Sequence, residues 1–137
     1  MRELRSFAAA VGLALPFCAG CRSVAYAPCP VELATSLPAD AFERCRGVLA
    51  GRFGPIALAD PAGFLLETDW ILVDEPPGRR RASVFRDGDG LAVMVEARFL
   101  VEPPVGLPYW SSVRGDPRAE RELADLLAGA LVGDGDG

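Results

Sequence analysis

The stretch RRRASVFRDGDGLAVMVEARFLVE, residues 79–102, decides the fold of this chain. It holds two runs of alternating hydrophobicity, residues 79–87 and 91–102, separated by Gly88-Asp89-Gly90. A turn of this composition between alternating runs is the strongest short-range signal of a β-hairpin, so we expect two antiparallel strands. In the second run one face is expected to be covered, as is common in antiparallel sheets. The residues expected on that covered face are Leu91, Val93, Val95, Ala97, Phe99 and Val101.

Two further strands are predicted before this hairpin. Residues 55–59 form a short alternating run, and the turn composition of residues 60–63 separates it from a longer run over residues 64–74. In the longer run Trp70 is expected on the same face of the strand as Leu66 and Leu72. We therefore expect Trp70 to pack into the core.

Helix signals flank the four strands. Pro38 and Asp40 are typical of a first helical turn and predict a helix over residues 38–52. Asp116-Pro117 has the residue types of an N-cap and first helical position, and the apolar period that follows ends near Val132. The order α-β-β-β-β-α predicts one α+β domain over residues 37–132, a small antiparallel four-stranded sheet with two helices packed on one face.

The N-terminal residues have the arrangement of an export signal. Arg2 and Arg5 precede a short apolar run that ends in Ala19-Gly20, immediately before Cys21. The run is shorter than the roughly 20 apolar residues that cross a bilayer, which favours a signal peptide over residues 1–20. Its end, Cys18-Ala19-Gly20-Cys21, resembles the lipobox of bacterial lipoproteins, although an aliphatic residue is commoner at the position of Cys18.

This resemblance implies that Cys21 is acylated and becomes the mature N-terminus. Two or more acyl chains give stable membrane anchoring. Residues 21–36, which contain two prolines and no helical period, are then expected to be a tether, and residues 133–137 a flexible tail. By the same analogy, Arg22 in place of Asp favours the outer membrane, with the domain facing the periplasm.

A second resemblance concerns the domain. The run Gly63-Phe64-Leu65-Leu66-Glu67-Thr68-Asp69-Trp70, followed by Arg79-Arg80-Arg81, is similar in outline to the helix-grip domains of BamC-type accessory lipoproteins. In those domains a helix precedes an antiparallel sheet and another follows it. The resemblance is one of pattern and carries no catalytic motif, so no active residue is transferred from it.

Composition excludes several kinds of chemistry. The chain has no Lys, His, Asn or Gln, so it lacks imidazole bases, imidazole metal ligands, Schiff-base lysines and a P-loop lysine. Without residues 1–20, it has 12 arginines against 18 acidic residues, a net charge of −6. This balance gives no electrostatic footprint for nucleic acid. We expect no cofactor, no metal and no catalytic residue.

Cysteine usage leaves two alternatives open. After cleavage and acylation only Cys29 and Cys45 remain as thiols, and in an oxidising envelope they can form a disulfide that contributes roughly 3 kcal/mol. Alternatively, Cys45 is a small hydrophobic residue on the inner face of a helix and Cys29 is a free thiol in the tether.

Polar residues on the sheet suggest a surface and not an active site. Glu67 and Asp69 lie on the same strand face, and a hairpin closed by the Pro-Pro-Gly loop brings arginines of the next strand beside them. A cross-strand salt ladder is therefore favoured over an acid–base pair or a cation site.

A contact surface is proposed from arginine and aromatic residues. Arg79, Arg80 and Arg81 can bind an anion, but alternation sends Arg80 to the opposite face from its neighbours. Tyr109 and Trp110 have the residue types of an interface hot spot, and the alternative is a small apolar cluster under their loop. The predicted contact residues are Tyr109, Trp110, Arg79 and Arg81.

From these features the sequence predicts a non-enzymatic, lipid-anchored protein of the cell envelope whose domain contacts another envelope component. The alternative is a periplasmic small-ligand-binding module with a cleft between the second helix and the sheet. An apolar cavity of about 300 Å³ or more in that interface would favour the ligand, and a dry interface would favour a protein partner.

Overall fold

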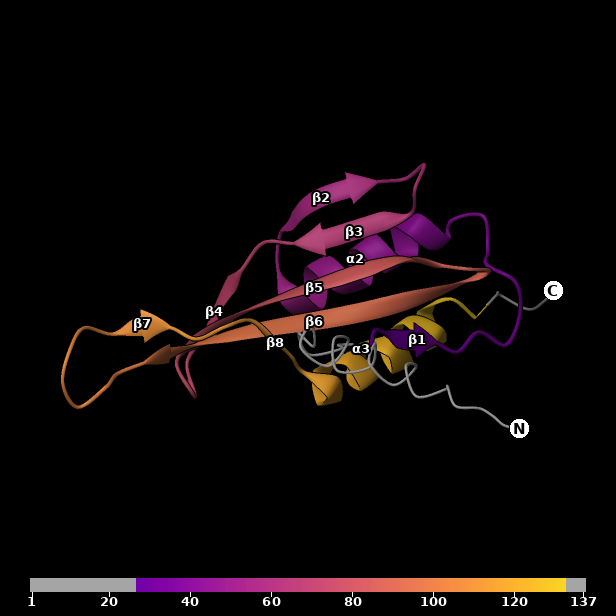
Figure 1. The fold of residues 1–137 in the computed structure, drawn as a ribbon. Coiled ribbons are helices and arrows are strands. Elements are labelled where there is room, and N and C mark those ends of the chain that lie inside the picture. The colour runs from indigo at the N-terminus through magenta and orange to yellow at the C-terminus, as the bar shows by residue number, and fades with distance from the viewer. Residues whose placement is uncertain (1–26, 133–137) are drawn as a thin grey trace, which may run out of the picture.

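The computed structural model describes residues 27–132 as an α+β fold in which an eight-stranded antiparallel sheet carries two helices on one face (Figure 1). The helices are α2 (Ala41–Phe53) and α3 (Pro117–Ala130). The strands are β1 (Cys29–Val31), β2 (Ile56–Asp60), β3 (Leu65–Thr68), β4 (Ile71–Val73), β5 (Gly78–Asp87), β6 (Gly90–Val101), β7 (Tyr109–Trp110) and β8 (Arg114–Gly115).

The predicted hairpin is the centre of the sheet. Strands β5 and β6 pair in register from Asp87 opposite Gly90 to Gly78 opposite Phe99. Gly88 in the turn has a φ of +61°, a conformation that glycine adopts without steric cost. At the other end, a Cβ on Gly78 would lie 2.5 Å from the carbonyl oxygen of Arg98, so only glycine allows this close pairing.

The prediction of four strands is an undercount. The central order is β1-β6-β5-β3-β2, with β4 paired to β5, and β7 and β8 paired to β6. The run predicted as one strand over residues 64–74 is divided into β3 and β4. Strands β1, β7 and β8 were not predicted, because at two or three residues they are too short for a period-two pattern to be recognised in the sequence.

One of these short strands lies in the segment expected to be a tether. Within residues 21–36, Cys29–Val31 pairs with β6, with Cys29 opposite Val93 and Val31 opposite Leu91. Val31 is buried in the core. This part of the segment therefore belongs to the domain, because its backbone completes the edge of β6.

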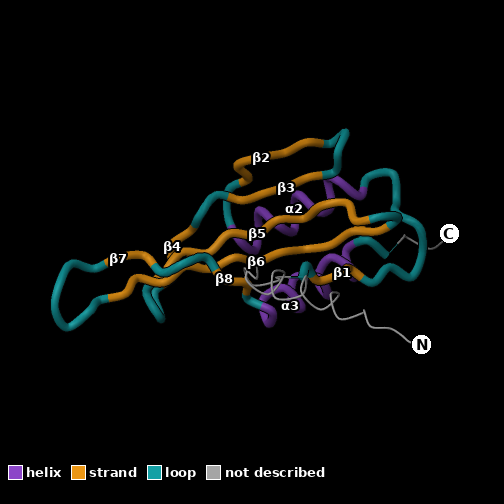
Figure 2. The backbone as a smooth tube through the Cα atoms, in the orientation of Figure 1, coloured by secondary structure: helices purple, strands orange, loops and turns teal. Residues whose placement is uncertain are grey.

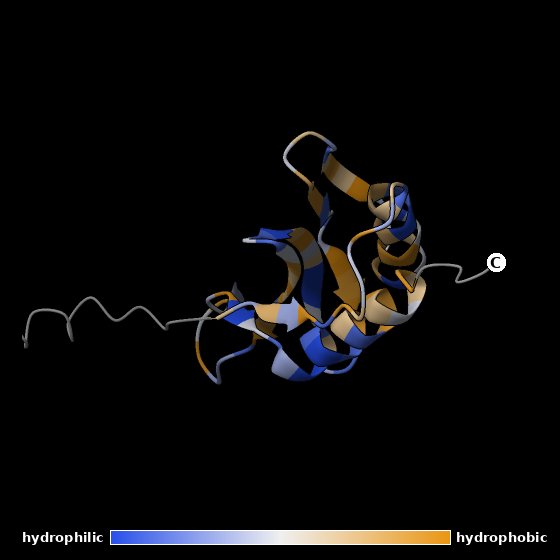
Figure 3. Ribbon diagram, turned by 90° about the vertical axis from the view of Figure 1, so that its right-hand side faces the viewer, coloured by the Kyte–Doolittle hydropathy of each residue, from blue (hydrophilic) through white to orange (hydrophobic). Residues whose placement is uncertain are grey.

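The core lies between the sheet and the helices. Both helices lie on the same side of the curved sheet in the side view of Figure 3, and the tube in Figure 2 shows α2 passing behind β3 and β5. The helices contribute mainly aliphatic side chains from one stripe each, as the helical period predicts. The largest fully buried side chains are Leu49, Leu66, Leu91, Leu123, Leu127, Leu131, Val84, Val93 and Val95.

The second helix begins as its sequence predicts. The side chain of Asp116 accepts a hydrogen bond from the backbone N–H of Ala119 at 3.1 Å, and Pro117 occupies the first turn. Within this helix the apolar Leu126 is exposed, whereas the charged Glu120 is buried.

Candidate interaction site

The two most exposed large apolar side chains of the described region, Val105 and Leu107, lie on a projecting arm. We define the β6–β7 arm as residues 99–110, in which the end of β6 pairs with β7 and residues 102–108 form the connecting loop. The arm projects lengthwise from the end of the sheet, beyond the helices, at the left of Figures 1 and 2. Val105 is 89% exposed, Leu107 85% and Tyr109 56%.

Tyr109 and Trp110 lie on opposite faces of this arm. They are consecutive residues of β7, opposite Val101 and Leu100 of β6, so their side chains point to different sides. Tyr109 is exposed, while Trp110 is half-buried and has the guanidinium of Arg79 stacked 4.7 Å from its ring centroid. Two of the four predicted contact residues, Arg79 and Trp110, are thus in direct contact.

Arg81, the fourth predicted contact residue, is part of a salt network on the open face, by which we mean the face of the sheet opposite the helices. Its Nε lies 3.0 Å from Glu96 Oε1, and its Nη1 lies 3.7 Å from Glu67 Oε1. The predicted ladder between Glu67 and an arginine of the next strand is confirmed. Asp69, expected in the same ladder, is exposed and forms no ion pair within residues 27–132.

Arg80 points to the other side, as alternation predicts. Its guanidinium lies 4.9 Å from the ring centroid of Phe53, at the end of α2. A single surface formed by all three consecutive arginines is therefore excluded.

Trp70 was expected in the core, and this prediction is wrong. Its half-buried ring lies on the open face, 4.7 Å from the guanidinium of Arg81 and 5.7 Å from that of Arg98. The pairing with β5 shifts by one residue here, from Glu67 opposite Ser83 to Ile71 opposite Arg80. A shift of one residue exchanges the two faces of a strand, which explains why Leu72 is also 74% exposed.

The outer edge of β6 is completed by one side chain from α3. Glu120 is only 3% exposed, and its Oε2 accepts a hydrogen bond from the backbone N–H of Val95 at 3.0 Å. The next residues of this edge pair with β8, and Ser111 Oγ accepts the N–H of Phe99 at 2.9 Å. Burial raises the pKa of Glu120, and the hydrogen bond from Val95 opposes this shift.

The disulfide alternative for Cys29 and Cys45 is not formed, and both thiols are free. Cys45 is fully buried on the inner face of α2, and burial raises the pKa of its thiol to about 11. Cys29 belongs to β1 and is half-buried at the sheet edge. The structure therefore agrees with the interpretation of Cys45 as a small core residue, while Cys29 is a strand residue and not part of a tether.

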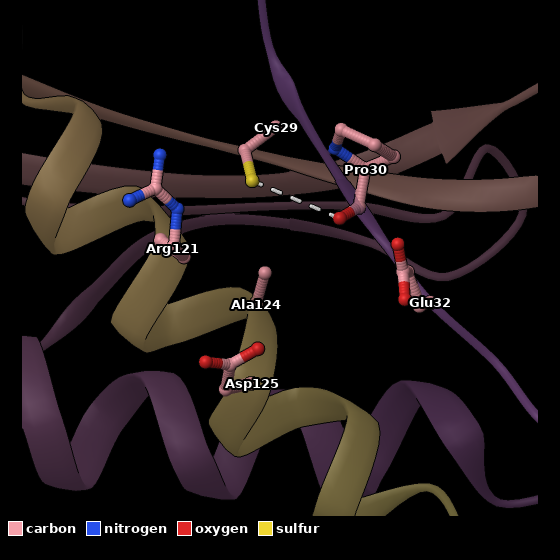
Figure 4. Close-up of a pocket in the computed structure, with 6 residues that line it drawn as sticks. All are labelled: Cys29, Pro30, Glu32, Arg121, Ala124 and Asp125. Carbon is pink, nitrogen blue, oxygen red and sulfur yellow. Dashed lines mark hydrogen bonds between the residues drawn. The ribbon is translucent and has the colours of Figure 1, made fainter.

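A small pocket lies between β1 and α3, close to where the ligand cleft was predicted. Its volume is about 240 Å³. Cys29 lies across from α3 in Figure 4, and its Sγ is 3.7 Å from the carbonyl oxygen of Pro30. Charged residues supply much of the lining, which differs from the apolar cleft expected for a small ligand. The lining residues are Cys29, Pro30, Glu32, Arg121, Ala124 and Asp125.

Residues 27–132 contain no group of three or more Cys, Asp or Glu side chains placed to hold a metal ion. In the same range, neither helix has the length and hydrophobicity needed to cross a membrane. Cys21, the signal peptide over residues 1–20 and the tail over residues 133–137 lie outside the described part of the chain.

Comparison with protein-family models, curated proteins and solved structures finds no match for this chain. The interaction site is therefore defined by geometry alone. Sequence reasoning missed two exposed residues of the arm, Val105 and Leu107. A signal was present, because a valine and a leucine within a Pro- and Gly-rich loop belong to no strand that would bury them.

Proposed function

We propose that this protein is a non-enzymatic, lipid-anchored component of the bacterial cell envelope, with Cys21 as the acyl acceptor. The support is the lipobox-like run before Cys21 together with a composition that lacks His and Lys. In this proposal the domain faces the periplasm from the outer membrane, and it acts by binding another envelope protein.

The β6–β7 arm is the proposed contact surface, and the exposure of its apolar side chains is the observation that carries this assignment. Val105, Leu107 and Tyr109 are each more than half exposed and lie within five residues of one another. Exposing aliphatic and aromatic groups to water is unfavourable by about 25 cal/mol per Å² of apolar area, so their burial by a partner stabilises a complex. Aromatic anchors of this kind carry a large share of interface energy.

The small-ligand alternative has weaker support. The space between α3 and the sheet is occupied by buried leucines, including Leu123 and Leu127. The neighbouring pocket of about 240 Å³ is lined largely by charged and small side chains. A protein partner at the arm therefore fits the geometry better than a small apolar ligand in a cleft.

Anchoring is tested by metabolic labelling with a fatty-acid probe. We expect the wild type to be labelled and to partition into detergent, and Cys21→Ala to be neither labelled nor cleaved at the same bond. Labelling that persists in Cys21→Ala, or a mature form that begins at another residue, would contradict the lipoprotein assignment.

The contact surface is tested by site-specific photo-crosslinking in cells. A photoreactive residue replaces Leu107 on the arm or, as a matched control, Leu126, a partly exposed leucine of α3. We expect one discrete heteromeric product from position 107, absent from position 126 and reduced by Tyr109→Ser. Equal products from both positions, or products with lipid alone, would reject the arm as a protein-binding surface.

A further inference from the structure

Two arginines face each other directly on the open face of the sheet. In the register of β5 and β6, Arg79 is opposite Arg98, and Leu72 of β4 is opposite Arg79 on the other side. The three side chains therefore form one row across three strands. Like charges directly opposite each other on a sheet are unfavourable, so the pairing of Arg79 with Arg98 needs a compensating interaction.

No carboxylate of the described residues supplies that interaction. The neighbouring Arg81 has two acidic partners, Glu96 and Glu67, at 3.0 and 3.7 Å. Within residues 27–132, Arg79 and Arg98 have no such ion pair, and Arg98 Nε is a buried donor without an acceptor. A buried donor that lacks an acceptor destabilises the fold, and such groups are rare in proteins. The row therefore has both excess positive charge and an unused donor.

The two tryptophans of the chain lie beside this pair. The guanidinium of Arg79 is 4.7 Å from the ring centroid of Trp110, and that of Arg98 is 5.7 Å from the ring centroid of Trp70. A cation–π contact supplies no hydrogen-bond acceptor, so the N–H donors of both guanidinium groups remain available. The aromatic contacts thus hold both arginines without consuming their donors.

We propose that Arg79 and Arg98, flanked by Trp110 and Trp70, form a binding site for a phosphate group. A phosphate carries one or two negative charges and several acceptor oxygens, so it can accept hydrogen bonds from two guanidinium groups at once and offset their repulsion. Its source is either the headgroup of an anionic phospholipid or a soluble phosphate. This inference does not depend on the protein partner proposed for the arm.

Tryptophan fluorescence reports on this site directly, because Trp70 and Trp110 are the only tryptophans. The purified full chain in neutral maltoside micelles is titrated with sodium phosphate at constant ionic strength, with sodium chloride as the reference. In a second arm, the micelles are doped with phosphatidylglycerol or with phosphatidylcholine. Isothermal titration calorimetry of the same samples measures binding independently of the optical signal.

We expect saturable binding of phosphate, of phosphatidylglycerol or of both, and Arg79→Gln is expected to weaken it about tenfold or more. Arg79 is exposed, so this variant keeps the fold. Arg86→Gln is the matched control, because Arg86 is an exposed arginine of the same strand on its other face, and its binding is expected to be unchanged. Arg98→Gln provides a second variant and is expected to weaken binding to a similar extent.

Saturation by inorganic phosphate identifies a soluble phosphate as a sufficient ligand, and a response restricted to phosphatidylglycerol identifies the lipid headgroup. Either result supports the site. Absence of saturable binding in both arms by both methods overturns the proposal. It is equally overturned if Arg79→Gln and Arg86→Gln bind alike, or if phosphatidylcholine and phosphatidylglycerol give the same response while free phosphate gives none.

Discussion

The carboxylate of Glu120 accepts the backbone N–H of Val95 at 3.0 Å, so that a helix side chain continues the hydrogen bonding of a sheet edge. The neighbouring N–H of Asp116 donates to the carbonyl oxygen of Val95 at 2.9 Å. The start of α3 is thereby attached to the middle of β6. Because β6 also carries the arm, this attachment connects the core to the proposed interaction surface.

Replacement of Glu120 tests the importance of this bond. Glu120→Ala removes the acceptor of a buried N–H and is expected to lower the free energy of unfolding by about 1–3 kcal/mol. Glu120→Gln keeps an acceptor oxygen and should lose less. The control is Glu122→Ala on the same helix, where the ion pairs with Arg118 and Arg52 are exposed and about 0.5 kcal/mol or less is expected. Urea denaturation measures all three; equal losses for Glu120→Ala and Glu122→Ala would contradict a structural role of the bond.

The pH dependence of stability follows from the same residue. Burial raises the pKa of Glu120 in the folded state above the ordinary glutamate value of about 4.3. The folded state then binds this proton more tightly than the unfolded state, so the contribution of Glu120 decreases as pH rises from about 4.3 through the raised pKa. Glu120→Gln lacks this step. Its stability relative to wild type should therefore rise across that interval, and denaturation midpoints that change in parallel would show that the pKa is not raised.

A pair of glycine substitutions tests the strand register and the helix separately. Gly47 lies within α2, and a Cβ added there meets no atom within 4 Å apart from its chain neighbours and the helix's own backbone, so Gly47→Ala is expected to stabilise the protein by about 0.5–1 kcal/mol. At Gly78 the added Cβ would lie 2.5 Å from the backbone of Arg98, so Gly78→Ala should destabilise it. Thermal denaturation measures whether each substitution raises or lowers the stability of the protein. A neutral Gly78→Ala would show that β5 and β6 are farther apart at this end.

The predictability of the fold varies with the length over which a pattern extends. The hairpin of β5 and β6 was predictable because its strands are long and its turn has a distinctive composition. The N-cap at Asp116 was predictable for a similar reason, since capping depends on adjacent residues. Strand β1 was not predictable, because Cys29-Pro30-Val31 shows no alternation of hydrophobic and polar residues. This segment becomes a strand only through pairing with β6.

The candidate site was predicted in part, and the wrong faces assigned to Trp70 and Leu72 have one physical origin. Residue type and strand alternation predict the selection of Tyr109, Trp110 and Arg79 and the pairing of Glu67 with Arg81. They do not predict the faces of Trp70 and Leu72, because the register shift between β3 and β4 depends on tertiary hydrogen bonds. One of these joins the N–H of Asp69 to the carbonyl oxygen of Pro55 at 3.0 Å, and another joins the N–H of Ala82 to Thr68 Oγ1 at 3.0 Å.

Truncation of Trp70 distinguishes its open-face position from a core position. Trp70→Ala removes contacts with Arg81 and Arg98 that are each worth about 0.5–1 kcal/mol, so a total loss of about 1–2 kcal/mol is expected. Leu66→Ala removes a fully buried side chain and should cost about 2–5 kcal/mol. Urea denaturation of both variants shows which substitution causes the larger loss in the free energy of unfolding. A larger loss for Trp70→Ala than for Leu66→Ala would place Trp70 in the core after all.

Cysteine reactivity tests the arrangement of β1 against α2. Cys29 is half-buried at the sheet edge, whereas Cys45 is fully buried and burial raises the pKa of its thiol to about 11, which keeps it protonated at neutral pH. Because the thiolate is the reactive form, a maleimide should modify Cys29 in the native protein and Cys45 only after unfolding. Peptide mass spectrometry assigns each modification, and Cys29→Ser serves as the control in which native modification of this pair is lost. Modification of Cys45 at the rate of Cys29, or recovery of a disulfide between them from the native protein, would show that Cys45 is not enclosed by the core.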